Sequence, residues 1–377
     1  MLVSFIIPAY NAADTIVRCL ESIRNLTLEK EEYEIIVIDD ASTDSTVSVI
    51  DGFKSQVSYP NGTIISNLTL LKQPENRRQG AARNRGVSVA NGEYICFVDS
   101  DDAVSEGIVD AVRLAKEKQA DMVAFHTANV NENGQITKEN ERLSFQKWQL
   151  FSGVEMQNKH SYWFSGPVAY IYSKAFLDKT NYPFREGVLY EDSDFVMVHL
   201  YYAKRMVYSQ ALGYLAYYRE GSTTHSVSFK NQSDYLLLGT RMLAFYTIIQ
   251  QDIDSGNRTD EGIQEFADGV LEGAIHNVTM SLKRLYKQTS PAEIVRFYRR
   301  IDSKVNRRAL YTDPRLYKYT YGWNKLAHLS IRHKYLSIFV NSCVLIAYQL
   351  YLKLKSNSTM FKYTKRLLSD IRFWCQE

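Results

Sequence analysis

The sequence predicts an α/β fold, with a doubly wound, Rossmann-like sheet followed by a mainly α-helical C-terminal region. In the first hundred residues, short apolar strand patterns alternate with helical patterns at the spacing of parallel βαβ units. From about Ser233, apolar residues instead recur at helical spacing. The 377 residues exceed one typical core, so we expect two domains, residues 1–229 and 230–377.

Polar residues follow the predicted strands and are expected at one edge of the sheet. Strands are predicted at residues 2–7, 34–38, 68–71 and 93–98, and helices from a cap at Asp14 to Arg24, from about Thr43, and over residues 79–90. In doubly wound sheets, ligands bind beyond the carboxyl ends of the strands. The polar clusters at residues 9–11, 39–40 and 99–102 should therefore share one edge.

The cysteines and the N-terminus indicate the compartment. None of the four cysteines has the close spacing of a zinc or redox motif, and Cys19 and Cys96 lie in apolar runs, where a free thiol acts as a small hydrophobe. The first residues lack the basic region and long apolar core of a signal peptide. We expect a cytoplasmic protein, either free or at the inner face of the cell membrane.

Charge is distributed unevenly along the chain. Residues 303–377 hold 14 Lys and Arg against 3 Asp and Glu, whereas the rest of the chain holds 31 against 39. A basic tail on an acidic body indicates an anionic partner for the tail. Membrane lipid, nucleic acid and a phosphorylated carrier all satisfy this condition. Nucleic acid is not the expected partner, because no recognition motif accompanies the basic residues.

Residues 334–355 form the most distinctive part of this tail. At helical spacing they place lysines on one half and apolar and aromatic residues on the other. The apolar stretch is short and interrupted for a membrane span, so a helix lying in an anionic membrane interface is one interpretation. The alternative is a core helix of the C-terminal domain or an oligomer contact, with the lysines simply solvated.

The hexapeptide at residues 97–102 is the most informative motif. An apolar strand delivers Asp99, Asp101 and Asp102, and alternate side chains of an extended segment point the same way. Like charges placed together are costly unless a cation or hydrogen-bond donors offset them. Such carboxylates suit Mg²⁺ or Mn²⁺ bridging a diphosphate. The simpler alternative is a turn with an Asp that caps a helix.

Two further acidic clusters accompany it. One, at residues 39–44, follows a strand, and one of its carboxylates could accept a hydrogen bond from a base N–H. The other, at residues 190–194, opens a predicted helix. Each also has a purely structural reading, as a turn with a cap at Thr43 or Asp44 and as an acidic first turn that the helix dipole favours.

Six segments together resemble the inverting family 2 glycosyltransferases, the group with the GT-A fold that builds bacterial surface polysaccharides. They are residues 3–11, 36–46, 80–86, 92–102, 184–192 and 217–222. Their order and spacing also fit this family over roughly the first 225 residues, so the set is specific although each segment alone is weak. The resemblance implies a mixed GT-A sheet, with a DXD motif at Asp99 and Asp101.

The resemblance also implies which residues bind a nucleotide-sugar donor. The six residues at the corresponding positions are Pro8, Tyr10, Asp40, Arg83, Asp99 and Ser100. In this interpretation Tyr10 stacks on the base, Asp40 hydrogen-bonds a base that is most often uracil, and Arg83 lies near the phosphates. Arg77 and Arg78 depart from the Gly-rich stretch of similar enzymes, so the choice of phosphate-binding arginine stays open.

The catalytic and metal-binding roles follow from the same resemblance. Asp101 is implied as the ligand of Mn²⁺ or Mg²⁺, and Asp192, in the pair with Glu191, as the catalytic base. His225 is a further candidate for the metal or the phosphates. A lone histidine in a polar loop is otherwise structural or solvated.

The predicted function is an inverting hexosyl- or N-acetylhexosaminyl-transferase that uses a UDP-sugar and a glycan acceptor, lipid-linked if the tail binds membrane. A nucleotidyltransferase is a rival, but it would carry a Gly-rich, Lys-containing phosphate loop near the first strand, and residues 3–11 have none. A catalytically inactive nucleotide- or glycan-binding module is a second rival. It is expected to lack the base, whereas Glu191 and Asp192 are both present.

Overall fold

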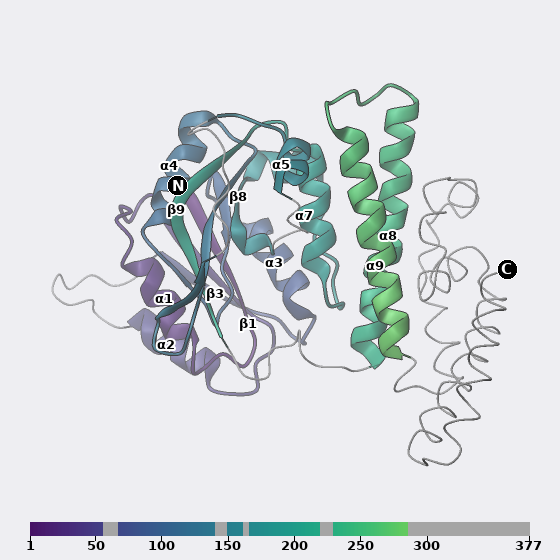
Figure 1. Ribbon diagram of the computed structural model, residues 1–377. Coiled ribbons are helices and arrows are strands. Elements are labelled where there is room, and N and C mark those ends of the chain that lie inside the picture. Colours follow the sequence, from purple (N-terminus) through teal and green to yellow (C-terminus); the bar gives the residue numbers. More distant parts are fainter. Residues whose placement is uncertain (56–66, 140–148, 161–165, 219–228, 286–377) are drawn as a thin grey trace, which may run out of the picture. The chain divides into compact units, whose positions relative to one another are not determined.

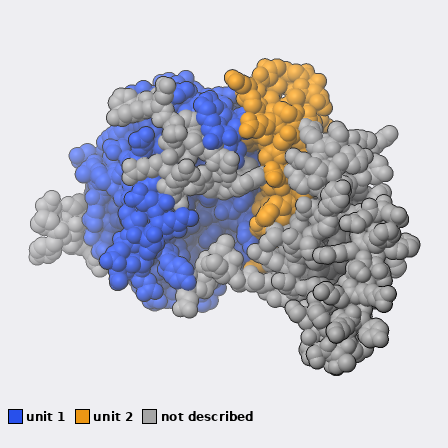
Figure 2. Space-filling model, in the orientation of Figure 1, with its two compact units in different colours: residues 1–222 blue, residues 223–377 orange. Residues whose placement is uncertain are grey.

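The computed structural model describes residues 1–55, 67–139, 149–160, 166–218 and 229–285 (Figure 1). The chain forms two compact units, residues 1–222 and 223–377 (Figure 2). The domain boundary between residues 229 and 230 stays a prediction.

Within the described residues, the first unit is built on a mixed sheet of nine strands in the order β3-β2-β1-β4-β8-β6-β9-β5, with β7 beside β6. Their bounds are β1 (Val3–Ala9), β2 (Tyr33–Asp39), β3 (Leu68–Lys72), β4 (Tyr94–Phe97), β5 (Ala103–Val104), β6 (Met122–Val130), β7 (Ile136–Glu139), β8 (Tyr170–Ser173) and β9 (Met206–Tyr217). β1 pairs in parallel with β2 and β4, and β2 with β3. β8 runs antiparallel to both β4 and β6, and β9 runs parallel to β6. The carboxyl ends of β1, β2, β3, β4, β6 and β9 therefore face the same edge.

Helices cover the sheet, as Figure 1 shows for α1, α2 and α4 on one side and α3 and α7 on the other. The bounds are α1 (Ile16–Arg24), α2 (Thr46–Ser55), α3 (Arg78–Val89), α4 (Gly107–Lys118), α5 (Gly153–His160), the short 3-10 helix η1 (Pro167–Ala169), α6 (Lys174–Thr180) and α7 (Glu191–Tyr202). Alternate residues of β1 serve the two sides: Phe5 belongs to the core cluster that contains α1 and α4 residues, whereas Ile6 lies under α3. A Cβ on Gly86 would lie 2.3 Å from the Ile6 side chain, so α3 needs this glycine to approach the sheet.

The alternating pattern predicted for the first hundred residues is confirmed by β1 to β4 and by α1 to α3. One local prediction is wrong. Asp14 does not cap α1: the N-cap residue is Thr15, and no side chain caps this helix. The chain instead turns into α1 through backbone hydrogen bonds from Thr15 and Ile16 to the carbonyl of Ala12. Cys19 and Cys96 are buried free thiols, in line with their apolar surroundings in the sequence.

The described part of the second unit consists of α8 (Phe229–Asp254) and α9 (Ile263–Leu285). The two helices pack along each other, and Leu243, Ile249 and Phe266 are at most 1% exposed. This region confirms the predicted helical character as far as Leu285. Among the described residues, no helix combines the length and apolarity that a membrane span requires. His225 and the predicted helix at residues 334–355 lie outside the described residues.

Candidate functional site

The predicted common edge is formed by the ends of three neighbouring strands. Residue Ala9 at the end of β1 pairs with Asp39 of β2, and the Asp40 N–H donates to the Ala9 carbonyl oxygen at 2.8 Å. On the other side of β1, the Val98 N–H donates to the Ile6 carbonyl oxygen at 3.0 Å. Because neighbouring strands lie about 4.8 Å apart, the polar residues after β2 and β4 begin about 10 Å from each other.

At the end of β2, the Asp40 carboxylate binds the backbone where α3 begins. It is 3% exposed, and its Oδ1 accepts hydrogen bonds from Gln73 Nε2 and from the Arg77 backbone N, both at 2.8 Å. Burial raises the pKa of Asp40, although hydrogen bonds from the Arg77 and Arg78 backbone oppose the rise. Asp44 has the structural role given as the alternative in the sequence analysis, because its carboxylate accepts a hydrogen bond from the Thr46 N at 3.0 Å where α2 begins.

Tyr10 and Pro8 stand at the neighbouring end of β1. Tyr10 is 47% exposed, which leaves about half of one large aromatic residue accessible next to Asp40. Pro8 is buried within β1 and pairs with Ile38 of β2. Asn11 follows with φ 48° and accepts, through its side-chain oxygen, a hydrogen bond from the Thr43 N at 2.8 Å.

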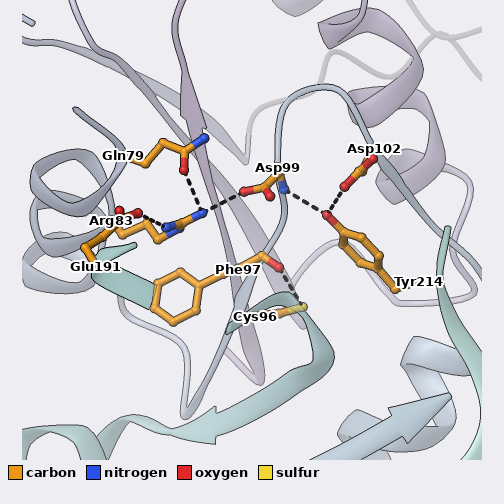
Figure 3. A network of polar contacts seen from close by, with 8 residues as sticks. All are labelled: Gln79, Arg83, Cys96, Phe97, Asp99, Asp102, Glu191 and Tyr214. Carbon is orange, nitrogen blue, oxygen red and sulfur yellow. Dashed lines mark hydrogen bonds and ion pairs between the residues drawn. The ribbon is translucent and has the colours of Figure 1, made fainter. Parts of the chain in front are cut away.

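At the end of β4, residues 99–102 form what we call the acidic turn, closed by a hydrogen bond from the Asp102 N to the Asp99 carbonyl oxygen at 3.1 Å. The Tyr214 hydroxyl of β9 donates to Asp102 Oδ2 at 2.7 Å and accepts from the Asp99 N at 3.2 Å (Figure 3). The Tyr217 N donates to Asp102 Oδ1 at 2.8 Å. Asp102 therefore does not cap a helix, and α4 begins only at Gly107.

Asp102 is a strongly perturbed carboxyl within the acidic turn. Burial, followed by the nearby charge of Asp99, raises the pKa of Asp102 to about 8, although the Tyr214 hydrogen bond opposes this. Asp99 and Ser100 are half-buried, as is Asp101. The turn therefore combines one carboxyl enclosed by protein with two that border the surface.

Arg83 of α3 joins the acidic turn to the start of α7. Its Nη2 donates to Asp99 Oδ1 and its Nη1 to Glu191 Oε1, both at 2.8 Å, and the arginine is only 2% exposed (Figure 3). Burial favours a lower pKa for Arg83, but the Asp99 and Glu191 carboxylates outweigh it and raise the pKa. Burial raises the pKa of Glu191, against the opposing effect of Arg83. Both terminal nitrogens of the arginine predicted to lie near the donor phosphates thus bind protein carboxylates.

The segment before α7 is fitted closely against α3. A Cβ on Gly80 would lie 2.3 Å from the carbonyl oxygen of Arg185 and 3.0 Å from Glu191 Cγ. The Asn84 side chain pairs with the backbone of Phe184, accepting from its N and donating to its oxygen, both at 2.9 Å. These contacts place Glu191 and Asp192 at the first turn of α7, as the sequence predicts.

Aromatic side chains pack between α7 and β4. Phe195 stacks on Phe184 with centroids 3.7 Å apart and lies 4.1 Å from the His199 ring, while Phe97 of β4 meets Phe184 edge-on at 5.2 Å. His199 is fully buried, and burial lowers its pKa to about 4, so it is neutral at neutral pH. Asp192, in the first turn of the same helix, is half-buried.

The structure thus brings Arg83, Asp99 and Glu191 into direct contact, with Asp192 next in the chain. Along the same edge, Tyr10 follows the adjacent strand β1 and Asp40 follows β2, the strand beyond it. Sequence reasoning missed Tyr214, Gly80 and Asn84. Asn84 and Gly80 lie within a segment that already carried the resemblance, but nothing local to Tyr214 distinguishes it from other tyrosines of an apolar strand.

Among the described residues, no group of three or more His, Cys, Asp or Glu side chains is arranged to hold a metal ion. Two carboxylates of the acidic turn are committed to protein partners, Asp99 to Arg83 and Asp102 to Tyr214. A Mg²⁺ or Mn²⁺ ion that bridges a diphosphate commonly takes only one or two carboxylates and fills its other positions with phosphate and water oxygens. Asp101, between these two residues, fits that limited role.

Sequence comparisons agree on the first unit. The profile described as "Glycosyl transferase family 2" matches residues 4–179, from β1 into α6. The poly(ribitol-phosphate) beta-glucosyltransferase of Bacillus spizizenii is 39% identical over 135 residues, 36% of this chain and 20% of that protein. The poly(ribitol-phosphate) beta-N-acetylglucosaminyltransferase TarS of Staphylococcus aureus is 30% identical over 135 residues, 36% of this chain and 22% of that protein. The chain thus spans about a fifth of the length of each.

A comparison of folds extends further along the chain. The crystal structure of S. aureus TarS residues 1–349 in complex with UDP-GlcNAc aligns with a TM-score of 0.63 at 20% identity, covering 93% of this chain and 92% of that one. This likeness confirms the predicted GT-A fold. The fold, the order of the acidic segments and the profile match agree that residues 4–179, within the first unit, are a glycosyl transferase family 2 domain.

Proposed function

We propose that this protein is an inverting glycosyltransferase that moves a sugar from a nucleotide diphosphate donor, of the UDP type, to a hydroxyl of a surface glycan. The observation that carries the proposal is the bridge that Arg83 makes between Asp99 and Glu191. It connects the strand end where a donor is expected with the helix start that carries Asp192. Donor and base sites that are built as one unit suit a direct displacement.

The donor site would extend along the strand ends from β2 to β4. The exposed Tyr10 ring offers a stacking surface for a base, and Asp40, buried beside it, offers a carboxylate to a base N–H. The UDP-GlcNAc complex of the similar TarS structure supports a UDP-sugar as the donor. The exposed Arg77 and half-buried Arg78 at the start of α3 are nearer the surface than Arg83, and we assign the phosphate contacts to them.

Asp101 is the residue that would hold Mn²⁺ or Mg²⁺ against the diphosphate. Such an ion, when bound, stabilises the negative charge of the departing nucleoside diphosphate. His225 remains a candidate further ligand. Asp99 stays with Arg83 in this scheme, so its contribution is to fix the backbone of the turn and to face the donor sugar with its half-buried carboxylate.

Asp192 would act as the base. Glu191 is 4% exposed and bound to Arg83, so its carboxylate is committed to support, whereas Asp192 is half-buried. Asp192 removes the proton of the acceptor hydroxyl as its oxygen attacks the anomeric carbon from the face opposite the diphosphate, which inverts the configuration at that carbon.

The acceptor and the cellular setting extend this proposal. The ribitol-phosphate transferases among the relatives support a polyol or sugar hydroxyl of a surface polymer as the acceptor. A lipid-linked glycan would follow if residues 334–355 bind an anionic membrane from the cytoplasmic side. Comparing liposome pelleting of the whole chain with that of a chain ending near Arg332 tests this extension, and equal pelleting would remove it.

A panel of UDP-sugars, incubated with the protein with and without Mn²⁺ and followed by UDP release, tests the activity. We expect slow hydrolysis of one sugar or a few related sugars, faster with Mn²⁺. Nucleotide-sugar binding without UDP release or transfer to any glycan would favour the inactive binding module. Consumption of a nucleoside triphosphate and a sugar phosphate would favour the nucleotidyltransferase. Inertness toward every nucleotide would contradict the glycosyltransferase, the nucleotidyltransferase and a nucleotide-binding module.

A further inference from the structure

Tyr214 lies on β9, far along the chain from the acidic turn, yet it is attached to both ends of that turn. Its single hydroxyl oxygen donates to Asp102 Oδ2 at 2.7 Å and accepts from the Asp99 N at 3.2 Å (Figure 3). β5, the strand that follows the turn, also pairs with β9 at this residue: Val104 of β5 lies opposite Tyr214. One side-chain oxygen therefore connects the first and last residues of the turn.

Water cannot easily replace this contact. Tyr214 is 1% exposed and Asp102 is 9% exposed. If the hydroxyl were removed, a backbone N–H and a carboxyl group would each lose a partner in a place that solvent hardly reaches. Leaving buried polar groups unpaired is more costly than the hydrogen bond itself is stabilising, so the turn would shift to recover partners.

The other attachments of the turn hold different atoms. Arg83 binds the Asp99 carboxylate at 2.8 Å, and the Arg18 guanidinium donates to the Asp101 carbonyl oxygen while lying 3.6 Å from the centre of the Tyr217 ring. None of these contacts fixes the Asp99 backbone N–H. Loss of the Tyr214 hydroxyl would therefore let the backbone rotate at the residue that starts the turn, and Asp101 would move with it.

We propose that Tyr214 is a positioning residue for the donor diphosphate, holding the acidic turn in the one shape that presents Asp101 to it. The inference rests on the proposed glycosyltransferase function. It assigns to β9, which contributes no carboxylate to the site, control over the affinity for the donor and its metal ion. A shift of about 1 Å in such a group is enough to cost roughly 100-fold in rate.

The substitution Tyr214→Phe tests this, with Tyr94→Phe as its control. Tyr94 is also a buried strand tyrosine, 3% exposed, and its hydroxyl donates to the Ala115 carbonyl oxygen at 2.8 Å. Both changes remove one buried hydroxyl oxygen, but Tyr94→Phe loses one hydrogen bond and Tyr214→Phe loses two, so Tyr214→Phe should lower the melting temperature more. Only Tyr214→Phe removes contacts to the acidic turn.

The measurement is calorimetric binding of UDP with and without Mn²⁺. We expect Tyr214→Phe to weaken UDP binding in Mn²⁺ by about tenfold or more and to raise the KM for the donor more than it lowers kcat, whereas Tyr94→Phe behaves like the unaltered protein. Equal UDP affinity in the two variants would overturn the inference and leave the proposed function standing. An unaltered protein that binds no UDP in either condition would overturn both.

A second variant keeps the test decisive if Tyr214→Phe does not fold. Asp102→Asn keeps one oxygen for the two donors, Tyr214 Oη and the Tyr217 N, and so disturbs the same end of the turn less severely. It should weaken UDP binding in Mn²⁺ by a smaller factor. Unchanged affinity in this folded variant would also contradict the role assigned to Tyr214.

Discussion

The ends of β2 and β4 look alike in sequence but are built differently. Both are buried strands that pair in parallel with β1 and end in aspartates at the same edge. At β2, the partners of Asp40 are neutral, the Gln73 amide and the Arg77 N–H. At β4, Asp99 is paired with the charged Arg83, which is itself shared with Glu191.

This difference indicates what each end contributes. Neutral donors at β2 connect the strand to α3 and would support any ligand there through geometry alone. At β4, a buried cation between two carboxylates is stable only while both remain close, because an unpaired charge in this setting is very costly. The acidic turn and the start of α7 are therefore held at a fixed separation, which is what a donor site and a base require of each other.

The largest effect should come from Asp192→Asn, which removes the base and leaves the Arg83 bridge intact. We expect transfer to fall by about 10²–10⁴-fold because general-base catalysis contributes that much. The rate of transfer in an assay with radiolabelled donor measures it, with Asp178→Asn, an exposed carboxylate on α6, as the control. Full activity in Asp192→Asn would show that another residue is the base.

Arg83→Met probes the charged bridge itself. It leaves the Asp99 and Glu191 carboxylates without their buried cation, so the free energy of unfolding should fall by about 3–5 kcal/mol. Arg85→Met is the control on the same helix: Arg85 donates to the Lys72 carbonyl oxygen, and its loss should cost about 1 kcal/mol. Urea denaturation measures both, and equal losses would mean that the bridge does not carry the stability assigned to it.

His199, which packs among the aromatic side chains between α7 and β4, should make the folded protein less stable in acid. His199 has a pKa of about 4 when folded against an ordinary value of 6.5, so between these values the unfolded chain binds a proton that the folded chain does not. The free energy of unfolding should fall as the pH falls through this window, by up to about 3 kcal/mol from this residue. His199→Phe should lose less stability between pH 6.5 and pH 4. Parallel pH profiles of the two proteins would refute this.

The smallest effect is expected at the β2 end. Asp40→Asn keeps the Oδ1 acceptor for Gln73 and Arg77, so it should cost about 1 kcal/mol or less of unfolding free energy. Asp99→Asn removes a charge from the bridge and should cost more. Chemical denaturation of the two variants measures both losses of unfolding free energy. A larger loss in Asp40→Asn than in Asp99→Asn would contradict this comparison of the two strand ends.

The sequence was sufficient for the parts of the site that lie close to regular local patterns. The alternating apolar runs predict β1 to β4, and the aspartates after β4 and at the start of α7 are visible as clusters. It did not reveal β8 or β9, whose aromatic residues have no clear period. The contact of Tyr214 with Asp102 spans 112 residues, and no local pattern encodes such a pairing.

Arg83 illustrates the same limit. The sequence places a basic residue near the expected phosphates. Only the structure, in which α3 packs closely against the start of α7 at Gly80, shows that Arg83 lies between two carboxylates. A guanidinium binds carboxylate and phosphate with the same fork geometry, so its residue type could not distinguish the two partners.

The most direct test is a crystal structure with UDP-sugar and Mn²⁺ bound. We predict the uracil ring against Tyr10, the diphosphate at Asp101, and the anomeric carbon on the side from which Asp192 can direct an acceptor hydroxyl. A nucleotide bound away from the carboxyl edge of β1, β2 and β4, or a sugar that Asp192 cannot approach from the face opposite the diphosphate, would contradict the single site described for this protein.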